Sequence, residues 1–155
     1  MYDIGISNVY IEKIVNPFSN CYKGTYSSNN LPNNLKSSNH FSIIVNLSSY
    51  NEPGTHWVAI YRKDSYLVYF DSLGLPPIVR DVELFLRNIN PNYETNVFEY
   101  QCFSSAMCGF YVILFVLLME KGFSFHKFRN LFTNNCKRND KRVVLLLNHV
   151  ICRMV

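Results

Sequence analysis

The sequence has few charged residues and no long apolar segment. Asp, Glu, Lys and Arg make up 17% of its 155 residues, and glycine and proline occur six times each. This composition excludes a collagen-like or highly charged disordered chain. The wholly apolar run at residues 110–119 is well short of the roughly 20 residues that a membrane-spanning helix needs. We therefore expect no contact with a membrane, and a buried helix at this position.

Apolar residues make up 48% of the chain and aromatic residues 15%, which is enough for a core at this length. We expect one domain over residues 1–155. Runs of β-branched and aromatic residues predict strands, and apolar residues at helical spacing predict helices. The expected strands cover residues 41–47, 57–62, 66–71 and 96–100, the expected helices cover residues 4–15, 78–88, 108–119, 125–132 and 141–154, and a long surface loop covers residues 20–40. This order predicts an α+β fold in which helices flank a mainly antiparallel sheet.

The five cysteines include no CxxC pair, and their number is odd. Because no signal-like segment follows Met1, we expect free thiols in an intracellular, reducing compartment. His149 and Cys152 have the spacing of half a zinc site, but the sequence has no second pair at ligand spacing. We therefore expect no metal site and no required cofactor.

Basic residues are concentrated near the C-terminal end. Residues 121–155 include eight basic and one acidic residue, a net charge of +7, whereas residues 1–120 include seven basic and ten acidic residues, a net charge of −3. Clustered Lys and Arg side chains gain affinity for nucleic acid by releasing counterions. The candidates for contact with DNA are Lys137, Arg138, Lys141 and Arg142. A solvated basic surface explains the same pattern equally well.

A histidine and an aspartate stand at the ends of two successive expected strands. His56 precedes the strand at 57–62, and Asp71 ends the strand at 66–71. In an antiparallel hairpin these positions lie at the same end, where the carboxylate can orient the imidazole as a general base. Such a pair on neighbouring strands also occurs for purely structural reasons.

The segment Gln101 to Phe110 includes a candidate nucleophile. Cys108 would lie in the first turn of the buried helix, where free backbone N–H groups favour thiolate over thiol. The Cys108 amide and the Gln101 side chain could bind an oxyanion. Trp57 and Gly109 are the candidates for the wall of the substrate site, with Gly109 leaving room for a substrate backbone. Cysteine is also common as a small core residue, and packing beneath the sheet would equally explain Trp57.

The order His56, Asp71, Gln101, Cys108 resembles the adenovirus endopeptidase (adenain) and its clan, which includes the proteases of SUMO and related modifiers. The six residues between Gln101 and Cys108 match this clan. Further local matches are Gly24-Thr25-Tyr26, Ile43-Ile44-Val45-Asn46, the His-Trp and Cys-Gly pairs, and Phe70-Asp71-Ser72-Leu73-Gly74. The resemblance covers residues 22–122, and the basic part at 123–155 has no match. Asp71 fits the SUMO-protease branch, whereas adenain has Glu there.

The resemblance implies a cysteine endopeptidase that cleaves after small residues, often glycine, in capsid or precursor proteins during virion maturation. It suggests a viral or virus-like source, with the protein in the host nucleus or the virion. Activation by a peptide or by DNA is a further suggestion of the family. No cysteine between Tyr22 and Gln101 matches the one by which adenain captures its peptide. The alternatives are a protease that removes ubiquitin-like modifiers, and an inactive nucleic-acid or capsid-binding module.

Overall fold

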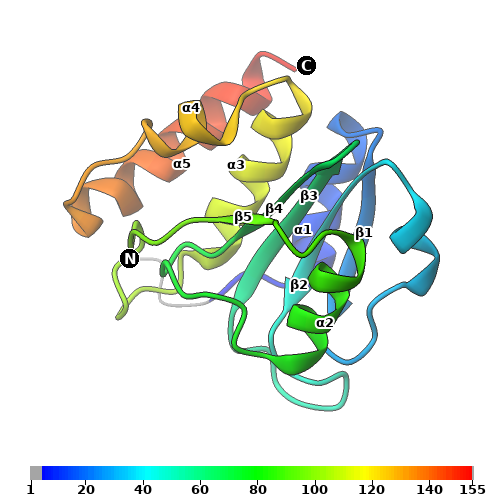
Figure 1. Ribbon diagram of the computed structural model, residues 1–155. Coiled ribbons are helices and arrows are strands. Elements are labelled where there is room, and N and C mark those ends of the chain that lie inside the picture. The colour runs from blue at the N-terminus through cyan, green and yellow to red at the C-terminus, as the bar shows by residue number, and fades with distance from the viewer. Residues whose placement is uncertain (1–4, 155) are drawn as a thin grey trace.

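The fold is a five-stranded sheet with helices on both faces (Figure 1). The computed structural model describes residues 5–154. The strands occur in the sheet in the order of the chain. They are β1 (Tyr22–Ser27), β2 (His40–Asn46), β3 (Trp57–Lys63), β4 (Tyr66–Phe70) and β5 (Glu94–Thr95). The helices are α1 (Asn8–Val15), α2 (Arg80–Ile89), α3 (Cys108–Glu120), α4 (Phe125–Arg129) and α5 (Cys136–Cys152), with short 3-10 turns η1 (Asn16–Phe18) and η2 (Asn33–Ser37).

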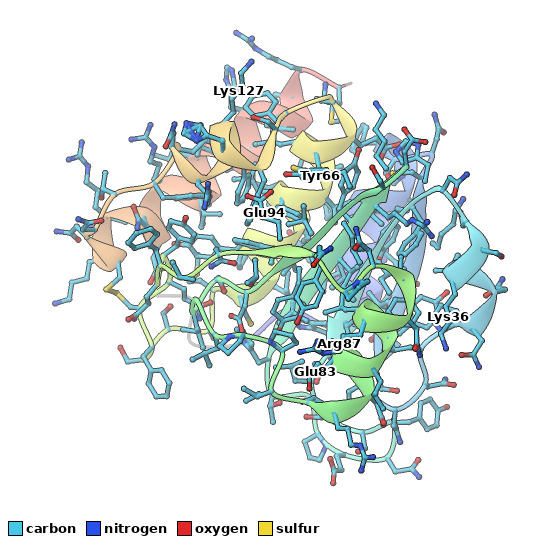
Figure 2. The ribbon with its side chains drawn as sticks, in the orientation of Figure 1. Lys36, Tyr66, Glu83, Arg87, Glu94 and Lys127 are labelled. Carbon is cyan, nitrogen blue, oxygen red and sulfur yellow. A yellow bond between two sulfur atoms is a disulfide. The ribbon has the colours of Figure 1, made fainter. Side chains whose placement is uncertain are left out.

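The sheet is mixed, so the prediction of a mainly antiparallel sheet is wrong. The central pairs β2–β3 and β3–β4 are antiparallel, whereas β1–β2 and β4–β5 are parallel. The chain crosses back through η2 between β1 and β2, and through α2 between β4 and β5. Each outer strand therefore runs in the same direction as its neighbour. The side chains of β4 and β5 also meet, since the Tyr66 hydroxyl donates to Glu94 Oε2 at 2.9 Å (Figure 2).

Two segments differ from the expected elements. The expected surface loop at 20–40 contains β1, an edge strand whose polar sequence and register shift between Tyr22 and Thr25 conceal it. The strand expected at 96–100 is irregular, and β5 lies just before it. There the Asn96 side chain bonds to both backbone groups of Asp71, at 3.1 Å to the N–H and 2.6 Å to the carbonyl. The Asn96 side chain thus makes the hydrogen bonds to Asp71 that the backbone of a neighbouring strand would otherwise make.

Helix α3 lies at the centre of the larger core, as the apolar run predicted. Twelve of its thirteen residues are buried, because α3 packs against β3 and is covered by α1, α4 and α5. The opposite face of the sheet packs against α2 and η2 in a second cluster. Within residues 5–154 no helix is both long and apolar enough to cross a membrane. The first residue of α3 is Cys108, so the core fixes the position of this cysteine.

A disulfide joins Cys102 to Cys136, with a Cα–Cα distance of 4.8 Å. The prediction of free thiols is therefore wrong for these two residues, while Cys21, Cys108 and Cys152 are free. Helix α5 begins five residues before the expected start at 141, and its first residue, Cys136, lies beside the segment that precedes α3. A separation of 34 residues in sequence concealed this contact. These two cysteines therefore give no support to the expected reducing compartment.

Candidate active site

His56 and Asp71 meet at one end of the β3–β4 hairpin. The antiparallel register pairs Ala59 with Phe70, so the start of β3 and the end of β4 are adjacent. His56 Nε2 donates to Asp71 Oδ1 at 2.7 Å. The Asp71 side chain is fully buried and that of His56 is 13% exposed. The carboxylate therefore fixes the orientation of the ring and stabilises its protonated form.

The Asp71 carboxylate is itself held by the turn that follows β4. The Leu73 N–H donates to Oδ1 at 2.8 Å, and Asn96 bonds to both backbone groups of Asp71. The second oxygen, Oδ2, is buried and has no partner within residues 5–154. Because Oδ1 accepts from both His56 and the turn, the carboxylate has little freedom to rotate away from the ring.

Cys108 lies on the other side of His56, at the start of α3. The Cys108 side chain is close enough to the His56 ring to contribute to the raised pKa of the ring. His56 Nε2 is bound to Asp71, which leaves Nδ1 for an exchange of protons with the sulfur. The first amides of a helix have no partner within it. The Cys108 and Gly109 N–H groups therefore lie at the open start of the helix, where they favour negative charge on a bound group.

The surroundings of His56 raise the pKa of its ring. Burial disfavours the imidazolium and lowers the pKa, but hydrogen bonds and charge interactions with Asp71 and Cys108 outweigh this and raise it from 6.5 to about 9. At neutral pH the ring is therefore protonated. A protonated ring between a carboxylate and a cysteine sulfur is the arrangement required for an imidazolium–thiolate pair.

Gln101 lies on the irregular segment that leads to Cys108 and is almost fully buried. Its Oε1 accepts from the Ser72 hydroxyl at 2.7 Å, and its Nε2 donates to the Ser105 carbonyl at 2.6 Å. These two bonds fix the plane of the amide. The amide nitrogen has two hydrogens, so one remains for a further acceptor.

An open cleft of about 940 Å³ contains this group of residues. His56, Cys108, Gln101 and Trp57 line it. Its other walls are residues 5–8, 25–27 and 103–106, together with the loop that precedes His56. Asp71 lies behind His56, away from solvent. The structure thus brings the predicted nucleophile, base and oxyanion donor to one open surface.

Of the two residues predicted to form the wall, Trp57 lines the cleft, whereas Gly109 lies against this chain's own Ile6. A Cβ atom on Gly109 would lie within 2.5 Å of Ile6 Cδ1 and closer still to Ile6 Cγ1. The Trp57 indole N–H donates to the Ile6 carbonyl at 3.0 Å. The space beside Gly109 is therefore filled by the N-terminal segment.

The predicted DNA-binding residues occupy the first two turns of α5. Lys137, Arg138 and Lys141 are exposed, and Arg142 is half-buried. The same turns contact the segment around Gln101 in three ways. These contacts are the disulfide at Cys102, a bond from Asn139 Nδ2 to the Tyr100 carbonyl at 3.1 Å, and a bond from the Cys102 N–H to Asp140 at 3.4 Å.

Several residues that shape the site were not identified from the sequence. Asn96 and Ser72 hold Asp71 and Gln101. Asn46 Oδ1 accepts from the N–H groups of Ser48 and Thr55 at 3.0 and 3.2 Å, and so fixes the loop that leads to His56. Asn46 lies in the segment that matches the clan, which was the available signal for it.

Within residues 5–154 no group of three His, Cys, Asp or Glu side chains is placed to hold a metal ion.

No family model matches the sequence, and no curated protein matches it. Solved structures do match. The ASFV pS273R protease has a TM-score of 0.57 and 16% identity, over 90% of this chain and 66% of the protease. A Se-Met structure of that protease has a TM-score of 0.48 and 20% identity, over 68% of this chain and 43% of the protease. AvrA with IP6 and CoA has a TM-score of 0.49 and 15% identity, over 90% of this chain and 53% of AvrA.

The protein therefore has a protease-like fold, as the resemblance to the adenain clan predicted. The likeness that carries this conclusion is that to the ASFV pS273R protease at a TM-score of 0.57. The chain spans between 43% and 66% of the length of the matched proteins. At 16% identity the comparison concerns the fold, and the chemistry depends on the residues of this chain.

Proposed function

We propose that the protein is a cysteine endopeptidase with Cys108 as nucleophile, His56 as base and acid, Asp71 as the group that orients His56, and Gln101 as an oxyanion donor. The observation that carries the proposal is that His56 bonds to Asp71 at 2.7 Å and lines the same open cleft as Cys108. The protease-like fold supports it.

The proposed reaction begins from the Cys108 thiolate and the His56 imidazolium. The sulfur attacks the peptide carbonyl carbon, and the Cys108 N–H and Gln101 Nε2 bind the resulting oxyanion. The C–N bond breaks as His56 gives its proton to the leaving amine. Neutral His56 then takes a proton from water, whose oxygen attacks the thioester and releases the acid and the thiolate. Each proton taken up is returned, so the enzyme ends unchanged.

For the substrate, we propose an extended protein segment with a small residue, often glycine, before the scissile bond. The source of this proposal is the resemblance to the adenain clan, which also suggests a capsid or precursor protein in the nucleus or virion. Removal of a ubiquitin-like modifier uses the same residues. Capsid-precursor peptides and modifier conjugates, assayed side by side, separate the two, because each alternative predicts turnover of only one of them.

We propose, second, that the basic start of α5 binds DNA, because three of its four cationic side chains are exposed. Reversing the charge of Lys137, Arg138, Lys141 and Arg142 should weaken DNA binding and flatten its dependence on salt. Unchanged binding would leave only a solvated basic surface. Peptidase activity measured with and without DNA and candidate peptides then tests whether either activates the enzyme.

The nucleophile is tested by reaction with iodoacetamide followed by peptide mapping of the wild type and His56→Ala. The proposal predicts preferential labelling of Cys108 that is lost in the variant. Cys152 is the internal control, since it is free, exposed and on α5. Equal labelling of Cys108 and Cys152, unchanged in His56→Ala, would contradict the proposal and favour an inactive binding module.

A further inference from the structure

Ile6 lies between the two residues that directly follow His56 and Cys108. Its carbonyl accepts from the Trp57 indole N–H at 3.0 Å. Its side chain packs so closely on Gly109 that a Cβ atom there would overlap it. One residue of the N-terminal segment therefore contacts both sides of the candidate active site, from the β3 strand to the start of α3.

The segment that includes Ile6 is firmly held. Ser7 is the N-cap of α1, and its hydroxyl accepts from the Tyr10 N–H at 3.2 Å. The Ile11 N–H donates to the Ser7 carbonyl at 3.0 Å, and Ile11 and Val15 are fully buried in the core that surrounds α3. The cap and the buried face of α1 thus fix the place where the chain passes Trp57 and Gly109.

Ile6 also faces the cleft. Residues 5–8 form part of the wall that includes Trp57 and Cys108, and Ile6 is half-buried there. Its position beside Gly109 means that the glycine makes room for an apolar side chain of this protein. A group that approaches the Cys108 sulfur along this wall therefore meets the Ile6 side chain and the Trp57 ring.

We propose that Ile6 is a selectivity residue, which limits the size of the group that can bind next to Cys108. This inference deepens the proposed function, because it explains a preference for a small residue at the scissile bond through a side chain outside the clan motifs. Shortening Ile6 opens the wall beside the nucleophile. A difference of one or two methylene groups in an apolar site changes discrimination by about tenfold or more.

The test uses two electrophiles of different size, iodoacetamide and N-benzyl-iodoacetamide. In each reaction the Cys108 sulfur forms a C–S bond, the C–I bond breaks and iodide leaves. The measured quantity is the ratio of the two rate constants at Cys108, obtained by peptide mapping in Ile6→Ala, Ile6→Val and the wild type. Val9→Ala is the matched control, since Val9 is 69% exposed in the first turn of α1, three residues after Ile6.

The proposal predicts that Ile6→Ala raises the rate for the benzyl reagent relative to the small one by about tenfold, that Ile6→Val has a smaller effect, and that Val9→Ala leaves the ratio unchanged. Peptides with glycine or leucine before the scissile bond should show the same change in the ratio of kcat/KM. An unchanged ratio of alkylation rates in Ile6→Ala would overturn the proposal.

A double-mutant cycle tests the contact itself. Gly109→Ala alone should lower the melting temperature, because its methyl group overlaps Ile6. The double variant Ile6→Ala with Gly109→Ala should recover most of that loss, since the space is then free. Additive losses would contradict the contact. Neither the alkylation ratio nor the double-mutant cycle depends on proteolysis. Labelling of Cys108 that does not depend on His56 would remove the proposed function, whereas an unchanged alkylation ratio in Ile6→Ala would remove only the role of Ile6.

Discussion

The two sides of the cleft are built in different ways. His56 and Asp71 stand at strand ends, and the backbone ladder between β3 and β4 brings them together. Cys108 and Gln101 border an irregular segment, residues 102–107. Side-chain bonds from Asn139, Ser72 and Asp140 to residues 100–102, and the disulfide from Cys102 to Cys136, hold the start of that segment.

This difference shows which contacts support each part of the proposed chemistry. On the strand side of the cleft, His56 and Asp71 are fifteen residues apart in the sequence. The β3–β4 ladder would persist if either side chain were changed. The other side, here called the oxyanion side, includes Cys108 and Gln101. It depends on contacts with α5, from residues that lie 34 to 39 positions farther along the chain than their partners. The helix that includes the basic residues is therefore also a structural support of Gln101.

Replacing the oxyanion donor should have the largest effect. In Gln101→Ala, we expect kcat to fall by about 10²–10³-fold with little change in KM, because the side chain acts on the charge of the transition state. Steady-state kinetics on a cleaved peptide measures this. Labelling of Cys108 by iodoacetamide should stay near the wild-type rate, and an equal loss of labelling would indicate that Gln101 supports the structure instead.

Breaking the disulfide should remove a support of the oxyanion side. Cys136→Ser removes a cross-link over 34 residues, which should lower the free energy of unfolding by about 3 kcal/mol. Urea unfolding without reductant measures the change. Cys152→Ser is the matched control, since Cys152 is free and exposed on the same helix. Equal stability of Cys136→Ser and the wild type would show that the cross-link does not support this side.

On the strand side, Asn96→Ala should cost about 1–3 kcal/mol, because it leaves the Asp71 backbone N–H and carbonyl without the Asn96 side chain. Asn92→Ala is the control, at an exposed position just after α2. If Asn96→Ala and Asn92→Ala unfold at the same urea concentration, the side chain does not replace the strand ladder as described.

The last effect concerns pH. The pKa of His56 is raised in the folded protein from 6.5 to about 9, so the folded state binds the proton more tightly than the unfolded chain. The resulting stabilisation is fully present below pH 6.5 and is lost as pH rises through about 9. Urea unfolding between pH 6 and 9.5 should show this decline, and His56→Ala should flatten it. A free energy of unfolding that rises with pH over this range in the wild type, but not in His56→Ala, would contradict the raised pKa of His56.

The sequence predicted the strand side better than the oxyanion side for a physical reason. The hairpin and α3 have strong local patterns, so the places of His56, Asp71 and Cys108 could be inferred. The polar edge strand β1 and the irregular stretch around Asn96 have no such pattern, and their pairing depends on distant partners. The disulfide and the contact between Ile6 and Gly109 likewise join residues that are far apart in the sequence, so no local pattern predicts them.

The pairing of His56 with both Asp71 and Cys108 can be tested without any substrate by NMR titration of the histidine ring signals. The spectrum of His56→Ala assigns the His56 signal among the four histidines. This pairing predicts a midpoint of about 9 in the wild type, and a lower midpoint in Cys108→Ala and in Asp71→Asn. A midpoint near 6.5 that neither substitution changes would contradict it.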